Sequence, residues 1–141
     1  MRQWSNLFAI ILLLFFSGYS HFYNLSKPPF SIYDEARLAT SAYEMTQTGN
    51  LIVTTLGYNP DLIGTKPPLM IWAQAACIRW FGINEFAVRL PAALCALLTI
   101  FLVFLFVLRV TGSSWSALLS GIVLCTAHSY LFDHGTRPGR I

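Results

Sequence analysis

Long runs of hydrophobic residues alternate with shorter polar segments along this 141-residue chain. The first run covers residues 4–23, close to the ~20 residues that a helix needs to cross the hydrocarbon core of a bilayer. Two further runs cover residues 90–108 and 115–131, and a short polar turn separates them. The pattern predicts three transmembrane helices, with residues 24–89 forming one long loop between the first and the second.

The first apolar run also has features of a cleaved secretory signal. Arg2 precedes a short apolar core at residues 7–16, and residues 18–20 form a small-x-small motif. Aromatic residues at its end favour a membrane span instead, because they resemble an interfacial belt. The two further spans that follow it also favour a membrane span over a cleaved signal.

The long loop begins with an amphipathic pattern. A proline pair at residues 28–29 breaks the first helix, and a new helix is predicted from Asp34 to the Gly49-Asn50 stop. Leu38, Ala42 and Met45 share one side of it. The other side is polar and consists of Asp34, Arg37, Ser41, Glu44 and Thr48. This division predicts a helix that lies at the membrane interface.

The rest of the loop is predicted to contain a strand and a second helix. Residues 51–56 are rich in β-branched side chains, and residues 57–60 have the composition of a turn. A helix should start at the Pro67-Pro68 pair and end at Gly82. Its length of about 22 Å is too short for a span and favours an interfacial or re-entrant helix. Asn84 should then cap the helix that leads into the second span.

The composition agrees with a membrane protein. Hydrophobic residues make up 55% of the chain and charged residues 11%, which is too apolar for an ordinary soluble domain. The net charge of +3 is small and its basic residues are scattered, so nucleic-acid binding is not expected. The three cysteines, Cys77, Cys95 and Cys125, lie in apolar runs without metal-binding spacing, and we interpret them as packing residues.

Two clusters of charge in the long loop suggest a functional site, Asp34 to Arg37 and Gly64 to Pro68. Asp34 is suited to capping the helix that it opens, but a cap does not require the adjacent Glu35. Two neighbouring carboxylates near a membrane surface can instead provide a group that accepts a proton from an alcohol.

Arg37 and Lys66 are the candidate cations of this site. Arg37 lies one helical turn after Asp34, so it could form an intrahelical ion pair or bind phosphate oxygens. Lys66 precedes a helix start, where a cation is unfavourable unless an anion also binds. It could equally extend to lipid headgroups. The four residues together favour transfer of a group from a lipid phosphate to a hydroxyl or amine.

His128 and His134 flank the end of the third span, on the side of the loop. We interpret them as interfacial polar residues, with metal binding as the alternative. The sequence predicts no metal site and no required cofactor, and it leaves dependence on a divalent metal open.

Several motifs follow one another in the order and spacing of a known family. They are Asp34-Glu35-Ala36-Arg37, Glu44-Met45, Thr48-Gly49-Asn50, Lys66-Pro67-Pro68-Leu69 with Trp72, and the segment from Phe81 to Pro91. With these motifs the chain resembles the N-terminal part of bacterial polyprenyl-phosphate-sugar glycosyltransferases, which include the aminoarabinose transferases of lipid A and relatives of the protein O-mannosyltransferases. The resemblance covers nearly the whole chain.

The resemblance implies an all-α polytopic membrane protein with a GT-C fold and two interfacial helices in the first periplasmic loop. Asp34 would be the catalytic base, Glu35 its acidic neighbour, and Arg37 and Lys66 the phosphate-binding residues. The donor would be a polyprenyl-phosphate sugar and the acceptor a lipid, glycan or protein. The family location is the bacterial inner membrane with the loop periplasmic, although counting charges alone would place the loop in the cytoplasm.

Two departures from the family pattern qualify these expectations. Thr65 stands where the lipid A branch often has Glu, which weakens assignment to that branch and to a metal held there. Relatives are several times longer. The segment from His134 to Arg137 begins like a family segment that normally continues with acidic residues, but here residues 138–141 depart from that pattern. We therefore expect a truncated product or fragment, inactive alone.

Two other classes of protein fit parts of the pattern. A piece of a multi-span transporter would need charged groups within its spans, and no Asp, Glu, Lys or Arg lies between Leu90 and Leu108 or between Trp115 and Leu131. A small accessory membrane protein would give the loop a purely structural role.

Overall fold

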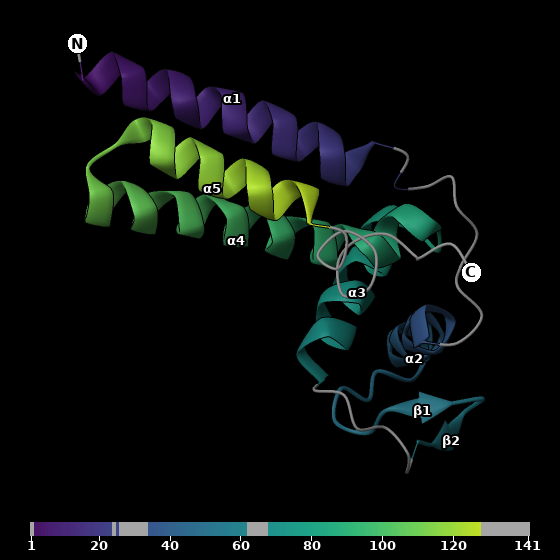
Figure 1. The fold of residues 1–141 in the computed structure, drawn as a ribbon. Coiled ribbons are helices and arrows are strands. Elements are labelled where there is room, and N and C mark those ends of the chain that lie inside the picture. The colour runs from purple at the N-terminus through teal and green to yellow at the C-terminus, as the bar shows by residue number, and fades with distance from the viewer. Residues whose placement is uncertain (1, 24, 26–33, 62–67, 128–141) are drawn as a thin grey trace. The chain divides into compact units, whose positions relative to one another are not determined.

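The computed structural model describes residues 2–23, 25, 34–61 and 68–127. In chain order these residues form helices and two short strands, α1 (Arg2–Phe22), α2 (Asp34–Thr48), β1 (Thr55–Leu56), β2 (Asn59–Pro60), α3 (Pro68–Phe81), α4 (Glu85–Thr111) and α5 (Ser114–Thr126) (Figure 1). The chain divides into two compact units, residues 1–23 with 93–141 (unit 1) and residues 24–92 (unit 2).

In unit 1, α1 and α5 pack side by side and run in the same direction. The Ser114 hydroxyl donates a hydrogen bond to Asn6 Oδ1 near the start of both helices. Two turns further on, Leu13 lies against Gly121. The core shared with α4 consists of Ala9, Leu13, Ile100, Phe104, Ala117, Leu118 and Cys125. Helix α5 follows α4 through a tight turn and returns along it (Figure 1).

The contact between α1 and α5 depends on the missing side chain of Gly121. A Cβ atom at this position would lie 2.6 Å from Leu13 Cδ1, and Leu13 is itself almost fully buried. We expect Gly121→Ala to destabilise unit 1 by about 1–3 kcal/mol, because overpacking a core displaces side chains. Thermal unfolding in detergent would measure the loss. Adding Leu13→Ala should recover part of it, and a double variant with fully additive losses would contradict the contact.

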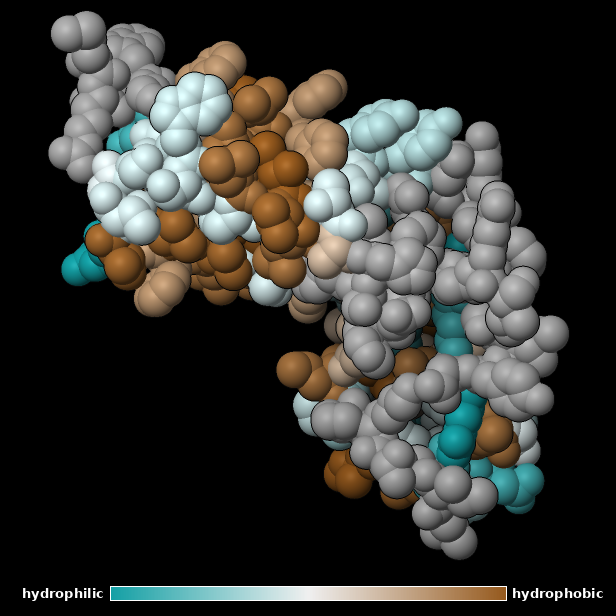
Figure 2. All heavy atoms as spheres, in the orientation of Figure 1, coloured by the Kyte–Doolittle hydropathy of each residue, from teal (hydrophilic) through white to brown (hydrophobic). Residues whose placement is uncertain are grey.

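The three predicted spans are supported only in part. Among the described helices, Glu85–Thr111 is long and apolar enough to cross a membrane, whereas the apolar helices Asn6–Phe22 and Ser114–Thr126 are shorter than the ~20 residues that a full span needs. Residues 128–131 of the predicted third span lie outside the described residues. Large apolar side chains, Phe8, Phe15, Phe106 and Val123 among them, cover the outside of unit 1, and Figure 2 shows hydrophobic residues gathered there.

In unit 2, α2 and α3 pack against each other and against the first turns of α4. Their core consists of Ala42, Met45, Ile71, Ala75, Ile78, Ala87 and Val88. The helix boundaries confirm the predicted signals, since α2 ends before Gly49 and α3 runs from Pro68 to Phe81 before Gly82. The apolar side predicted for α2 is therefore its core side.

The predicted strand is shorter than expected. Within the predicted strand, residues 51–56, only Thr55 and Leu56 are in strand conformation. They pair antiparallel with Pro60 and Asn59 of β2 across a two-residue turn. Gly57 and Tyr58 have positive φ angles of 64° and 61°, as the tight hairpin turn requires. This small hairpin is an exception to the all-α class that we predicted.

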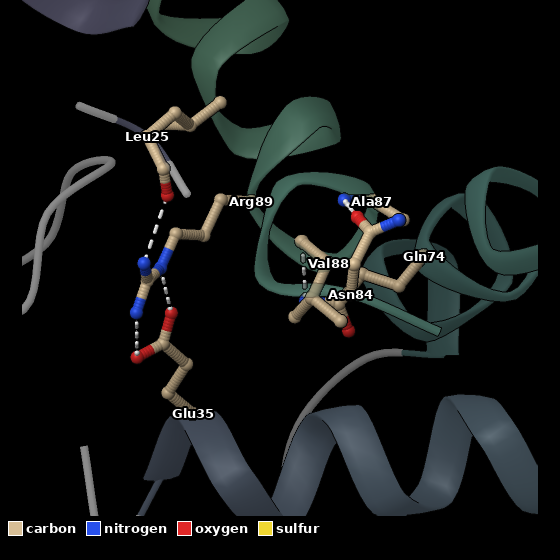
Figure 3. A network of polar contacts seen from close by, with 7 residues as sticks. All are labelled: Leu25, Glu35, Gln74, Asn84, Ala87, Val88 and Arg89. Carbon is tan, nitrogen blue, oxygen red and sulfur yellow. Dashed lines mark hydrogen bonds and ion pairs between the residues drawn. The ribbon is translucent and has the colours of Figure 1, made fainter. Parts of the chain in front are cut away.

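The start of α4 explains a buried polar residue in α3. Asn84 caps α4 as predicted, because its Oδ1 accepts a 2.7 Å hydrogen bond from the Ala87 amide. Pro91 lies inside the same helix and lacks an amide hydrogen. The buried Gln74 side chain donates a 3.1 Å hydrogen bond to the Val88 carbonyl, one turn before that proline (Figure 3). Gln74 thus supports the α4 backbone beside the proline.

Candidate functional site

The first turn of α2 is bound to α4 by an ion pair that the sequence did not predict. Arg89 Nε lies 2.5 Å from Glu35 Oε1, and Arg89 Nη2 lies 3.1 Å from Glu35 Oε2 (Figure 3). Nη1 of the same guanidinium donates a 2.8 Å hydrogen bond to the Leu25 carbonyl. Arg89 is only 3% exposed, so protein acceptors such as these stabilise its charge in place of water. Glu35 is therefore part of a structural ion pair that anchors the start of α2.

A second ion pair binds the same helix from the side of the hairpin. Arg37 Nη2 lies 2.5 Å from Asp61 Oδ1 and 2.7 Å from Oδ2, while Nε lies 3.2 Å from Oδ2. The Asp61 side chain is nearly buried, whereas about a third of Arg37 is exposed. Within the described residues, Arg37 Nη1 makes no hydrogen bond. Asp61 thus orients the guanidinium and leaves one edge of it available.

The hairpin that carries Asp61 is fixed to α2 by buried polar groups. Glu44 accepts hydrogen bonds from the Thr55 hydroxyl and from the amides of Gly57, at 2.8 Å, and Tyr58, at 3.2 Å. The Ser41 hydroxyl donates a 2.8 Å hydrogen bond to the Thr55 carbonyl. Ser41 and Glu44 are both buried. The sequence assigned these residues to the polar side of an interfacial helix, but their tertiary role is to hold the hairpin.

The structure places three of the four predicted site residues, Asp34, Glu35 and Arg37, at the start of α2. Glu35 and Arg37 lie on the first turns of α2, each with an acidic or basic partner from another element. Asp34 is the first residue of α2, and its side chain is not described. Lys66 lies outside the described residues, as do His128 and His134. The proximity of Asp34 to Lys66 stays a prediction.

The described side chains offer no cluster for a metal. No group of three or more His, Cys, Asp or Glu residues gathers among residues 2–23, 25, 34–61 and 68–127. The described cysteines are free thiols. Burial raises the pKa of the Cys77 thiol, which disfavours the thiolate that would bind a metal. This agrees with a packing role for Cys77.

Arg89 and Asp61 are the residues that the sequence analysis did not assign. Arg89 forms an ion pair with a residue of α2 that is 54 positions away in the sequence, and Asp61 with one that is 24 positions away. Both separations are beyond the range of helical periodicity. A signal was present for Arg89, which lies in the segment from Phe81 to Pro91 whose sequence resembles the family. No comparable signal marks Asp61.

Comparison with known proteins assigns the chain to a family of glycosyltransferases. Residues 65–137, just over half of the chain, match the family described as dolichyl-phosphate-mannose-protein mannosyltransferase. The chain belongs to this family, which agrees with the resemblance seen in its sequence. The match includes Arg89 and the whole of α3, α4 and α5.

Two relatives match a longer part of the chain than the family match does. One uncharacterized protein of Aquifex aeolicus (strain VF5) is 32% identical over 111 residues, which are 79% of this chain and 22% of the relative. Another from the same organism is 35% identical over 89 residues, which are 63% of this chain and 21% of the relative. The matched segment thus spans about a fifth of each relative. No solved structure matches the chain.

Proposed function

We propose that the chain is part of a membrane glycosyltransferase that transfers a sugar from a polyprenyl-phosphate donor to a hydroxyl group. The acceptor is a lipid, glycan or protein, and the reaction takes place on the periplasmic side of the bacterial inner membrane. The observation that carries the proposal is the start of α2, where Glu35 and Arg37 are each held by an ion pair in a chain of this family. The family description favours mannose or a related hexose as the sugar, with a pentose as the alternative.

Asp34 acts as the general base in this proposal. The acceptor hydroxyl loses its proton to the Asp34 carboxylate as its oxygen attacks the anomeric carbon of the donor sugar. The bond between that carbon and the phosphate oxygen breaks, and its electron pair leaves with the polyprenyl phosphate. Configuration at the anomeric carbon is inverted. The Arg89 ion pair holds the helix end that carries Asp34, which favours the alignment that such a displacement needs.

Arg37 and Lys66 stabilise the charge that develops on the leaving phosphate. The Arg37 guanidinium is already held by Asp61 through Nε and Nη2, so its Nη1 edge is preorganised for a phosphate oxygen. Preorganised donors stabilise a transition state without reorganisation at the moment of reaction. Lys66 adds a second positive charge ahead of α3, where the free amides of the helix start also favour an anion.

Replacing Arg37 tests this assignment. In a full-length protein that carries this sequence, Arg37→Gln should slow sugar release from the donor by about 100-fold, as expected for loss of one preorganised charge donor. Membrane vesicles would be assayed with polyprenyl-phosphate mannose tritiated in the sugar, by following label transferred out of the donor. Arg79→Gln is the matched control, because Arg79 is exposed on α3. Equal rates in both variants would contradict phosphate binding by Arg37.

A further inference from the structure

The segment after α2 presents large apolar side chains outward. Leu51, Ile52 and Val53 are 55%, 87% and 43% exposed, and Trp72 of α3 is 41% exposed. We call these four residues the apolar tip. No charged residue occurs from Asn50 to Pro60. The core of unit 2 is built from other side chains, so packing within the unit does not explain the apolar tip.

Polar side chains satisfy backbone groups of the apolar tip. Asn50 Oδ1 accepts hydrogen bonds from the amides of Ile52, at 3.1 Å, and Val53, at 3.2 Å. The Trp72 indole donates a 2.7 Å hydrogen bond to the Leu51 carbonyl. A loop in water could leave these groups to solvent, but in a lipid environment each needs a protein partner. The apolar tip therefore combines exposed hydrocarbon with three backbone groups, the Ile52 and Val53 amides and the Leu51 carbonyl, that are bonded to side chains of the protein.

The chain itself holds unit 2 close to a bilayer. Helix α4 begins in unit 2 and continues into unit 1, and the whole helix (Glu85–Thr111) is long and apolar enough to cross a membrane. Tyr58 on the hairpin turn is also exposed, and Tyr and Trp favour the interface between lipid and water. A membrane surface is thus the apolar environment permanently within reach of unit 2.

We propose that the apolar tip inserts into the interfacial layer of the membrane that α4 crosses. Leu51, Ile52 and Val53 would enter the boundary between headgroups and acyl chains, and Trp72 would lie at headgroup level. The occupant of this surface is phospholipid. Because the apolar tip directly follows α2, its insertion would fix the height of that helix above the bilayer. The proposal does not depend on sugar transfer.

A fluorescent label at Ile52 tests the insertion. The chain would carry Cys77→Ala, Cys95→Ala, Cys125→Ala and Ile52→Cys, be labelled with bimane and be reconstituted in phosphatidylcholine vesicles. The label should be quenched several-fold more strongly by nitroxide lipids with the nitroxide about 5–10 Å below the headgroups than by aqueous iodide, since interfacial apolar faces reach that depth.

Thr40→Cys in the same background is the matched control. Thr40 is exposed on α2, two turns before its end, and should be quenched mainly by iodide. Circular dichroism would show that both labelled chains keep their helices. Strong iodide quenching at position 52 would overturn the proposal. So would shielding of position 52 from both quenchers, because protein rather than lipid would then cover the apolar tip.

Discussion

An Asp34→Asn variant of the full-length protein is expected to lose sugar transfer by about 10²–10⁴-fold, the usual contribution of a general base. Asparagine has nearly the same size as aspartate but cannot take the proton from the acceptor hydroxyl. It is also as good as aspartate at capping a helix. The substitution therefore separates the two interpretations of Asp34, because the start of α2 should stay intact while the chemistry fails.

The same membrane vesicles and tritiated donor would measure this loss, and limited proteolysis would check that the loop keeps its fold. A helpful comparison is Glu85→Gln, which removes an acid from the first turn of α4 in the same unit. Transfer at the wild-type rate in Asp34→Asn would show that Asp34 only caps the helix. Loss of transfer together with rapid cleavage of the loop would assign the defect to folding.

The second large effect concerns the ion pair between Glu35 and Arg89. We expect Glu35→Met to destabilise unit 2 by about 3–5 kcal/mol, since it removes a carboxylate that pairs with a buried guanidinium. Arg89 is the more buried partner, with 3% of its side chain exposed against 20% for Glu35. The bond from Arg89 to the Leu25 carbonyl does not neutralise the charge. The free energy of unfolding would be measured by denaturant titration in detergent.

A double variant distinguishes the effect of breaking the ion pair from the effect of losing either side chain. Glu35→Met with Arg89→Met removes both charges, so much of the lost stability should return. Glu85→Met is the control, and the loss of its favourable position at a helix start should cost only about 0.3–1 kcal/mol. A double variant as unstable as Glu35→Met alone would contradict the assignment of the cost to the loss of this ion pair.

Local signals in the sequence predicted the helices of unit 2 well. Gly49 and Gly82 marked the ends of α2 and α3, and Asn84 marked the start of α4, because these signals act within one turn of the helix. The role of the polar side of α2 could not be predicted in the same way. Glu44 and Ser41 are buried against a hairpin whose position depends on tertiary packing, and a hydrophobic pattern alone reads such residues as exposed.

The candidate site was predicted by residue type but not by pairing. The sequence singled out Glu35 and Arg37, and the structure adds their partners Arg89 and Asp61. A charge that is conspicuous in an apolar chain can be found without a structure, whereas the carboxylate or guanidinium that neutralises it lies at an arbitrary distance along the sequence. Asp34 and Lys66 also lie far apart in the sequence, so their proximity stays a prediction.

The parallel packing of α1 and α5 has a consequence for the architecture of the chain. Helix α4 runs opposite to α5, so the end of α1 and residue 93 of α4 lie at the same end of unit 1. Residues 24–92 therefore form an insertion whose two connections leave one end of a helical scaffold. Insertions of this kind can diverge in length and content while the scaffold keeps its packing, which would let related chains change what they recognise and retain the same helical scaffold.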